Sequence, residues 1–167
     1  MKELVHAILD QYALPWYGTH GVSHWARVLE NGRRLVAETG AVLEVVELFA
    51  LFHDARRSNE GFDPGHGQRG AEYAATLRNG LFRLPQAWFD LLFTACVAHT
   101  NGSVEGDITV RTCWDADRLD LGRVGFVIDP QRLGTQAARD PQVITWASQR
   151  ARARVVPDLV RSEWALG

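Results

Sequence analysis

The chain has 167 residues, a formal net charge of −2 and two cysteines. A length of this order suits one domain built around one hydrophobic core, so we expect residues 1–167 to form a single domain. The 18 basic and 20 acidic residues give no electrostatic footprint for a nucleic-acid polymer or an anionic membrane, and we expect neither as a partner.

Hydrophobic spacing predicts helices along the whole chain. They are expected over residues 2–13, 23–38, 42–53, 66–78, 85–99, 108–124, 130–138 and 141–152, with a weaker one after Pro157. Gly40 is a natural C-terminal stop, Pro85 suits a first helical turn, and the turn-rich residues 58–67 predict a surface loop. No stretch alternates as a strand would, so the predicted fold class is all-α, a helical bundle.

The cysteines and the apolar segments bear on the cellular compartment. Cys96 and Cys113 lie in apolar stretches without a paired spacing, which predicts reduced core residues rather than a disulfide or a thiolate zinc site. The first residues lack the apolar stretch of a signal peptide, and the other apolar runs are too short or too interrupted to span a bilayer. We therefore expect a cytoplasmic protein.

The most informative feature is the pair His53-Asp54, which follows the almost wholly apolar residues 42–52. A helix that is apolar on nearly every side belongs in a core. An unpaired carboxylate is costly there, and an imidazole needs hydrogen-bond partners. A divalent metal ion is a natural way to compensate both side chains.

Three other predicted helices also carry metal-competent side chains. The apolar residues 85–99 end in His99. At 100° per residue, Asp117 falls on the buried stripe of its helix, whereas Asp115 points almost opposite. His24 likewise shares a helix face with apolar residues and is predicted to face inward.

Each of these residues also has an ordinary explanation. A lone buried histidine is usually a hydrogen-bonded core residue, and His6 and His20 are interpreted in this way. Asp54 could pair with a neighbouring arginine, Asp117 could do the same, and His66 could simply open its helix. The joint pattern of nitrogen and oxygen donors nevertheless favours a divalent Mn, Fe, Mg or Zn ion over a structural zinc site.

The order His24, His53-Asp54, Asp117 resembles the His…His-Asp…Asp signature of the HD-domain superfamily of metal-dependent phosphohydrolases. The resemblance covers about residues 20–125. It implies an all-α bundle of the HD-domain type in which these four residues hold the metal.

Relatives with two metals carry two further histidines between the dyad and the final aspartate, and His66 and His99 stand in those places. The resemblance therefore implies one or two ions, with Asp54 bridging them in the second case. Both histidines could instead bind substrate phosphate, and the two interpretations stay open. Residues 129–167 carry no recognisable chemistry and are expected to complete the bundle or to form a homo-oligomer interface.

The activity implied by the resemblance is hydrolysis of a small phosphate ester, with a nucleotide as the first guess, by a metal-activated water. Asp54 would orient that water, and His66 or His99, if not bound to metal, would act as general acid. Cationic side chains would steady the phosphoryl charge. Four arginines are candidates for this role, each with a surface ion pair as the alternative, and Arg57 is also expected among the catalytic residues: Arg56, Arg57, Arg69 and Arg118.

Two other functions fit the same residues. Some relatives with six histidine and aspartate ligands are mixed-valence di-iron oxygenases, which oxidise C–H bonds instead of hydrolysing phosphate esters. A non-catalytic, metal-containing binding module is the other alternative.

Overall fold

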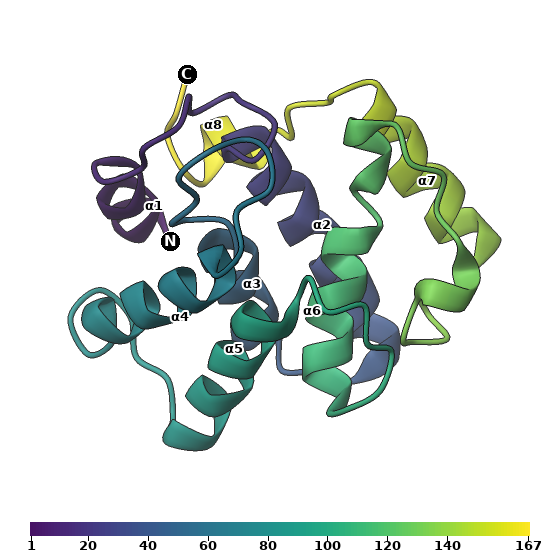
Figure 1. Cartoon of the computed structure of the whole chain (residues 1–167), viewed down its shortest axis with the longest axis horizontal. Coiled ribbons are helices and arrows are strands. Elements are labelled where there is room, and N and C mark those ends of the chain that lie inside the picture. Colours follow the sequence, from purple (N-terminus) through teal and green to yellow (C-terminus); the bar gives the residue numbers. More distant parts are fainter.

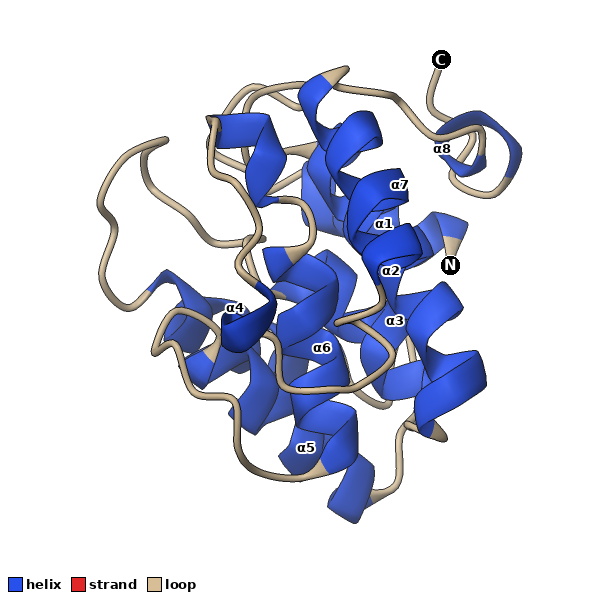
Figure 2. Ribbon diagram, turned by 90° about the vertical axis from the view of Figure 1, so that its right-hand side faces the viewer, coloured by secondary structure: helices blue, strands red, loops and turns tan.

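The computed structural model describes residues 1–167 and contains helices and loops but no β-strand (Figure 2). The helices are α1 (Lys2–Leu9), α2 (Val22–Thr39), α3 (Leu43–Phe52), α4 (His66–Leu77), α5 (Gln86–Ala98), α6 (Ile108–Arg118), α7 (Pro141–Arg152) and α8 (Leu159–Ser162), with short 3₁₀ turns η1 (Leu121–Val124) and η2 (Pro130–Arg132). The predicted all-α class is confirmed.

Helix α3 lies at the centre of the bundle, and α2, α4, α5 and α6 pack against it. Its side chains Val45, Phe49 and Phe52 are completely buried, which agrees with a helix that is apolar on nearly every side. Helix α2 is amphipathic and buries Trp25 and Leu29 in the same core. The C-terminal end of α3, where His53 and Asp54 follow, is therefore surrounded by other elements.

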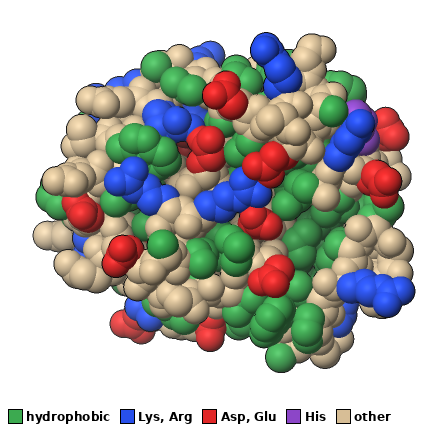
Figure 3. Space-filling model, turned by 180° about the vertical axis from the view of Figure 1, so that it is seen from behind, with side chains coloured by type: hydrophobic (Ala, Val, Ile, Leu, Met, Phe, Trp, Pro, Cys, Tyr) green, Lys and Arg blue, Asp and Glu red, His purple; other side chains and the backbone are tan.

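The two ends of the chain meet on one side of the bundle, where Figure 1 shows α1 beside α8. The ring nitrogen Nε2 of His6 lies 2.9 Å from the carbonyl oxygen of Trp164. This contact gives His6 the ordinary hydrogen-bonded role expected for it. On the face drawn in Figure 3, acidic and basic side chains are intermixed and neither sign dominates. No helix combines the length and the apolar character needed to cross a membrane.

Three predicted helices are shorter in the structure. The first ends at Leu9, because the amides of Gln11 and Tyr12 bond to carbonyls three residues back and tighten the chain into turns. The helix predicted over 108–124 ends at Arg118 and continues only as η1, where Gly125 at φ 89° stops it. Over 130–138 only η2 forms, since the following residues make a loop that covers α6.

Close packing of α4 depends on two glycines one helical turn apart. A Cβ atom on Gly70 would collide with the carbonyl oxygen of Phe52 at the end of α3. A Cβ atom on Gly67 would collide with the carbonyl oxygen of Cys96 in α5. The absence of side chains at these positions lets the start of α4 approach both neighbouring helices.

We predict that Gly70→Ala lowers the free energy of unfolding by about 1–3 kcal/mol, because the new methyl group meets backbone that cannot move aside. In an unobstructed helix the same change would be stabilising by roughly 0.5–1 kcal/mol. Urea unfolding followed by circular dichroism measures the difference. Gly80→Ala serves as the control, since its nearest atom would be at an ordinary 3.6 Å; equal stability of the two variants would contradict the close approach.

Candidate metal centre

The four residues of the first predicted ligand set converge in the structure. His24 lies in the first turn of α2, His53 and Asp54 follow α3, and Asp117 lies in the last turn of α6. The Nε2 atom of His24 is 3.0 Å from Nε2 of His53, 3.5 Å from Oδ2 of Asp54 and 3.4 Å from Oδ1 of Asp117. The structure therefore brings these four side chains close together.

The hydrogen bonds of His24 and His53 fix which ring nitrogen carries a proton. Nδ1 of His24 lies 2.7 Å from a carboxylate oxygen of Asp120, and Nδ1 of His53 lies 3.0 Å from the carbonyl oxygen of Phe49. Both partners are acceptors, so each Nδ1 donates its proton and each neutral ring leaves a lone pair on Nε2. Two lone pairs that face each other at 3.0 Å repel, so either a metal ion or a proton must lie between them. Burial opposes a charge on His24, but its contacts with Asp120 and Asp54 outweigh burial and raise its pKa, so a proton can take that place when no metal ion is bound.

His66 and His99 repeat this arrangement. Nδ1 of His66 lies 2.6 Å from the carbonyl oxygen of Asp63, and Nδ1 of His99 lies 2.7 Å from that of Cys96. Their Nε2 atoms are 2.9 Å apart. Four histidines thus form two pairs, each held through Nδ1 and each directing its two Nε2 atoms at one point.

Asp54 lies between the two pairs and offers one carboxylate oxygen to each. Oδ2 is 3.5 Å from His24 Nε2 and 3.7 Å from His53 Nε2. Oδ1 is 3.1 Å from His66 Nε2 and 3.9 Å from His99 Nε2. The geometry therefore provides two groups of donors that share a single carboxylate.

Burial and mutual charge set the protonation states that a metal ion requires. Burial lowers the pKa of His53 to about 3, so its ring is neutral at neutral pH. Burial opposes ionisation of Asp117 as well, but the surrounding histidines and Arg123 outweigh it and lower the pKa to about 2. The pKa of Asp54 is likewise well below its ordinary value, because contacts with His53, His20, His24 and His66 outweigh burial. Neutral imidazoles and ionised carboxylates are the forms that bind metal.

The donor atoms also fit a cation by distance and by chemistry. Atoms bound to one ion at about 2.0–2.2 Å lie roughly 3–3.5 Å apart. The distances from His24 and His53 to each other and to the carboxylates of Asp54 and Asp117 run from 3.0 to 3.8 Å and are close to that range. Mixed imidazole and carboxylate donors suit Zn, Fe or Mn, which agrees with the divalent ions expected from the sequence.

Two polar residues of the centre were missed in the sequence. His20 was interpreted as ordinary, yet its Nδ1 lies 2.7 Å from Oδ2 of Asp54. It precedes α2, in a loop where helical periodicity gives no signal. Asp120 was not singled out, although its Oδ2 accepts the proton of His24 Nδ1 and its Oδ1 accepts from Nε of Arg27 at 2.7 Å. The one feature of the sequence that could have indicated Asp120 is its position three residues after Asp117.

Asp115 points away from the histidines as predicted, but it is completely buried. Its carboxylate accepts hydrogen bonds from the amides of Gly134 and Thr135 and from the Thr135 hydroxyl, each at 2.7 Å. The loop after η2 covers this side of α6. Asp115 therefore holds that loop in place and takes no part in the centre.

Of the four candidate arginines, Arg57 is the one that reaches the centre. Its Nη1 lies 3.3 Å from Oδ1 of Asp54 and 3.1 Å from Nε2 of His66. Arg56 instead lies over the ring of Tyr73, and Arg69 pairs with Asp63.

Arg118 lies beside the centre but is already engaged. Its Nη1 and Nη2 donate to the carbonyl oxygens of Arg132 and Ser103 at 2.9 and 2.6 Å. It also lines a cavity of about 600 Å³, together with His99 and Asp117. Pockets of about 300–1,000 Å³ are typical for small-molecule ligands. This cavity therefore gives a small molecule direct access to both donor groups.

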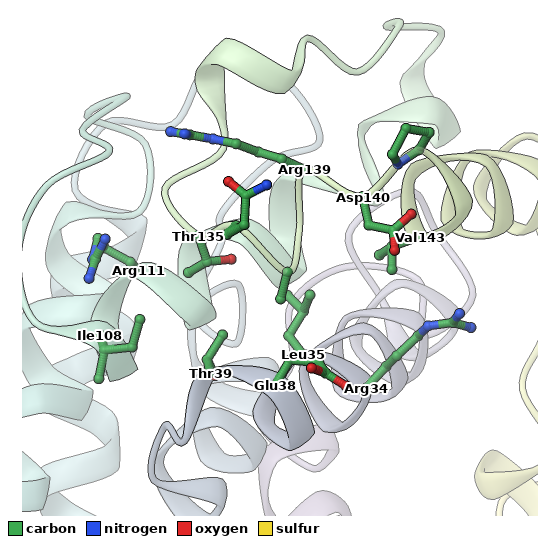
Figure 4. A pocket seen from close by; sticks show the side chains of 13 residues that line it. Arg34, Leu35, Glu38, Thr39, Ile108, Arg111, Thr135, Arg139, Asp140 and Val143 are labelled. Carbon is green, nitrogen blue, oxygen red and sulfur yellow. The ribbon is translucent and has the colours of Figure 1, made fainter.

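A larger cavity, of about 870 Å³, lies away from the centre, between α2, the start of α6 and the loop before α7 (Figure 4). None of the histidines lines it. Arg111 and Arg139 reach into this region, and each donates to a carbonyl of the covering loop, at Gly134 and Leu133 respectively. Arg111 thereby fastens the loop to α6, and Arg139 holds the loop together internally.

Comparison with known proteins gives one informative match. No protein-family model matches the sequence, and no curated protein matches it either. The structure is similar to a crystal structure described as a predicted HD superfamily hydrolase from an uncultured Thermotogales bacterium, with a TM-score of 0.68 and 24% sequence identity. The similarity covers 98% of this chain and 92% of the other. The chain therefore has the fold of an HD-superfamily protein, as the resemblance implied.

We predict that Asp120→Asn lowers metal affinity about 10–100-fold, because loss of the charge weakens the orientation and basicity of His24. Isothermal titration with Mn²⁺ or Zn²⁺ measures the change. Asp115→Asn is a matched control, since it removes a comparably buried carboxylate of the same segment whose hydrogen bonds all go to the covering loop. Equal losses of metal affinity in the two variants would contradict a specific role of Asp120.

Asp63 gives a prediction about pH. Burial opposes its ionisation, but hydrogen bonds from Ser58 and Arg69 outweigh burial and lower its pKa from 3.8 to about 2. Because the folded-state pKa is depressed, this stabilisation is complete above pH 3.8 and is lost as the pH falls through 2. Asp63→Asn should therefore lower stability at pH 7 by about 1–2 kcal/mol.

Thermal unfolding of the wild type and of this variant at pH 7, 5, 4 and 3 tests that expectation. The difference in Tm should be constant at pH 7 and 5 and should shrink at pH 3. A difference that stays constant over the whole range would show that the Asp63 carboxylate does not stabilise the loop through its charge.

Proposed function

We propose that this protein is a member of the HD superfamily that hydrolyses a small phosphate ester at a centre of two divalent ions. The observation that carries the proposal is the presence of two histidine pairs on either side of Asp54. Each ring is fixed through Nδ1, and each pair faces a different oxygen of the Asp54 carboxylate. The fold shared with a protein described as a predicted HD superfamily hydrolase supports the same class.

The residues divide into two groups according to what they would hold. His24, His53 and Asp117 form one group of mutually close donors and would hold one ion, and Asp54, His66 and His99 form another and would hold the second. The other oxygen of Asp54, 3.5 Å from Nε2 of His24, would complete the first group. Divalent ions at such a site supply a nucleophilic water of lowered pKa and polarise a phosphoryl oxygen. Arg57 donates to His66 in this structure, and that hydrogen bond would have to break before the second ion could bind.

The other roles in the proposed reaction fall to side chains around the two donor groups. The guanidinium of Arg57, released from His66, is the cation nearest to Asp54 Oδ1 and can neutralise charge that develops on a phosphoryl oxygen. The hydrogen bond between His20 and Asp54 holds the bridging carboxylate in one orientation. The ester group would occupy the cavity of about 600 Å³ that His99 and Asp117 line. Its walls carry both apolar groups, such as Phe126, and polar ones, such as Asn101.

The same donor set also suits two iron ions, so the oxygenase and binding-module alternatives need a direct test. Phosphate release without oxygen uptake supports the hydrolase. Metal-dependent oxygen uptake without phosphate release would overturn it in favour of an oxygenase. Bound metal with neither reaction would overturn it in favour of a binding module.

We predict that Asp54→Asn lowers the rate of phosphate release on the order of a hundredfold or more, because both donor groups lose the shared carboxylate. Elemental analysis of the purified protein should find two ions per wild-type chain and fewer in the variant. A screen of nucleotides and sugar phosphates with Mn²⁺, Mg²⁺, Fe²⁺ and Zn²⁺ supplies the substrate.

Asp90→Asn is the control, because Asp90 is an exposed carboxylate on α5 that accepts a hydrogen bond from Gln86 and belongs to neither donor group. It should retain wild-type activity and metal content. Wild-type protein that holds no metal and releases no phosphate with any of these ions would contradict the proposed function.

A further inference from the structure

A small basic cavity lies at the start of α2, outside the two donor groups. Its volume is about 180 Å³, and none of the histidine and aspartate ligands lines it. No acidic side chain lines it either. Its polar lining is dominated by three arginines, with a serine, a threonine and a tyrosine beside them: Arg27, Arg123, Arg154, Ser23, Thr19 and Tyr17.

The positive charge of this cavity is only partly compensated. Arg27 donates from Nε to Oδ1 of Asp120 at 2.7 Å, and Arg123 Nη1 lies 3.8 Å from Oδ2 of the same carboxylate. Asp120 also accepts the proton of His24. Arg154 makes no side-chain hydrogen bond and no ion pair. Arg27 and Arg123 thus pair with the single carboxylate of Asp120, and the exposed Arg154 pairs with none, which leaves an excess of positive charge for an anion to neutralise.

The backbone of Arg154 is held in an unusual conformation. Its φ is 50°, and it follows Ala153, the C-terminal cap of α7. The amide of Val155 bonds to the carbonyl of Arg150 across this turn, a closure in which glycine is the residue normally found. A non-glycine residue in this region stores conformational strain, and such strain gathers at functional positions.

The start of α2 adds a further attraction for an anion. No side chain caps this helix at Gly21, so the positive end of its dipole is available, although the amide of Val22 already donates to the carbonyl oxygen of Trp16. Ser23, in the first turn, lines the cavity with a hydroxyl that can donate. The volume of about 180 Å³ is below the 300–1,000 Å³ or so that is typical for a larger organic ligand. The cavity therefore suits one small ion or the terminal group of a larger ligand.

We propose that this cavity binds a tetrahedral oxyanion of the phosphate class, held by Arg123 and Arg154 with help from Ser23. Arginine forks match the oxygens of such an anion in pairs. The site is separate from the metal centre but close to it, since Nη2 of Arg123 lies 3.4 Å from Nδ1 of His20. The proposal depends on neither metal binding nor hydrolysis.

Arg154→Gly provides a test that does not endanger the fold. It removes the one wholly unpaired guanidinium and places at φ 50° the residue that the turn favours. Isothermal titration of the full-length, metal-loaded protein with inorganic phosphate measures the effect. We expect affinity at this cavity to fall about tenfold or more, while Tm stays the same or rises.

Arg152→Ala is the matched control, because it removes the same charge two residues away from a side chain that does not line the cavity. It should keep wild-type affinity. Neither arginine belongs to the donor groups of the metal centre, so phosphate that binds there should respond equally to the two substitutions, and the comparison isolates the cavity. Equal affinity in wild type and Arg154→Gly, or equal losses in both variants, would overturn the proposal.

Titration with glycerol phosphate separates the two sources of the anion. A loss in Arg154→Gly that is confined to inorganic phosphate identifies the free ion as the occupant. An equal loss for glycerol phosphate identifies the phosphate group of a larger ligand. Both results support an oxyanion site at the start of α2.

Discussion

The ionised carboxylate of Asp54, buried at 2% exposure, is the group on which the rest of the structure depends. An isolated charge in a protein interior is very costly, so it persists only where cationic groups or hydrogen-bond donors surround it. Here His20, His24, His66 and Arg57 approach its two oxygens from four different segments. The arrangement of α2, α4 and the loop after α3 around the end of α3 satisfies that requirement.

The same requirement explains why much of the centre is predictable from the sequence. A run as apolar as residues 42–52 must be buried, and the His53-Asp54 pair that follows it must then be buried too. His24 and Asp117 lie on the apolar faces of regular helices. The helical periodicity of 100° per residue is therefore enough to predict that both side chains point inward. His66 and His99 were placed by the resemblance to known metal proteins, and their joint geometry depends on the glycines of α4, whose packing role only the fold reveals.

What the sequence did not disclose lies where periodicity fails. His20 belongs to a loop, and the direction of a loop side chain depends on tertiary contacts rather than on spacing. Asp120 lies beyond the last regular turn of α6, where the chain tightens toward η1. Helical spacing predicts only that Asp115 points away from Asp117, and the loop at Gly134 and Thr135 that buries it was expected to be helical. For each of these three residues, a contact between segments distant in the sequence decides the environment of the side chain. Such contacts cannot be predicted from sequence periodicity.

The spread of the donor residues along the chain has a consequence for the lifetime of the folded state. They are contributed by α2, by the segment after α3, by α4, by the end of α5 and by α6. Two ions bound to these donors and joined through Asp54 would act as non-covalent cross-links that close several long loops at once. Separation of these helices would then require the ions to leave. The persistence of the bundle would thereby depend on the free concentration of metal around it.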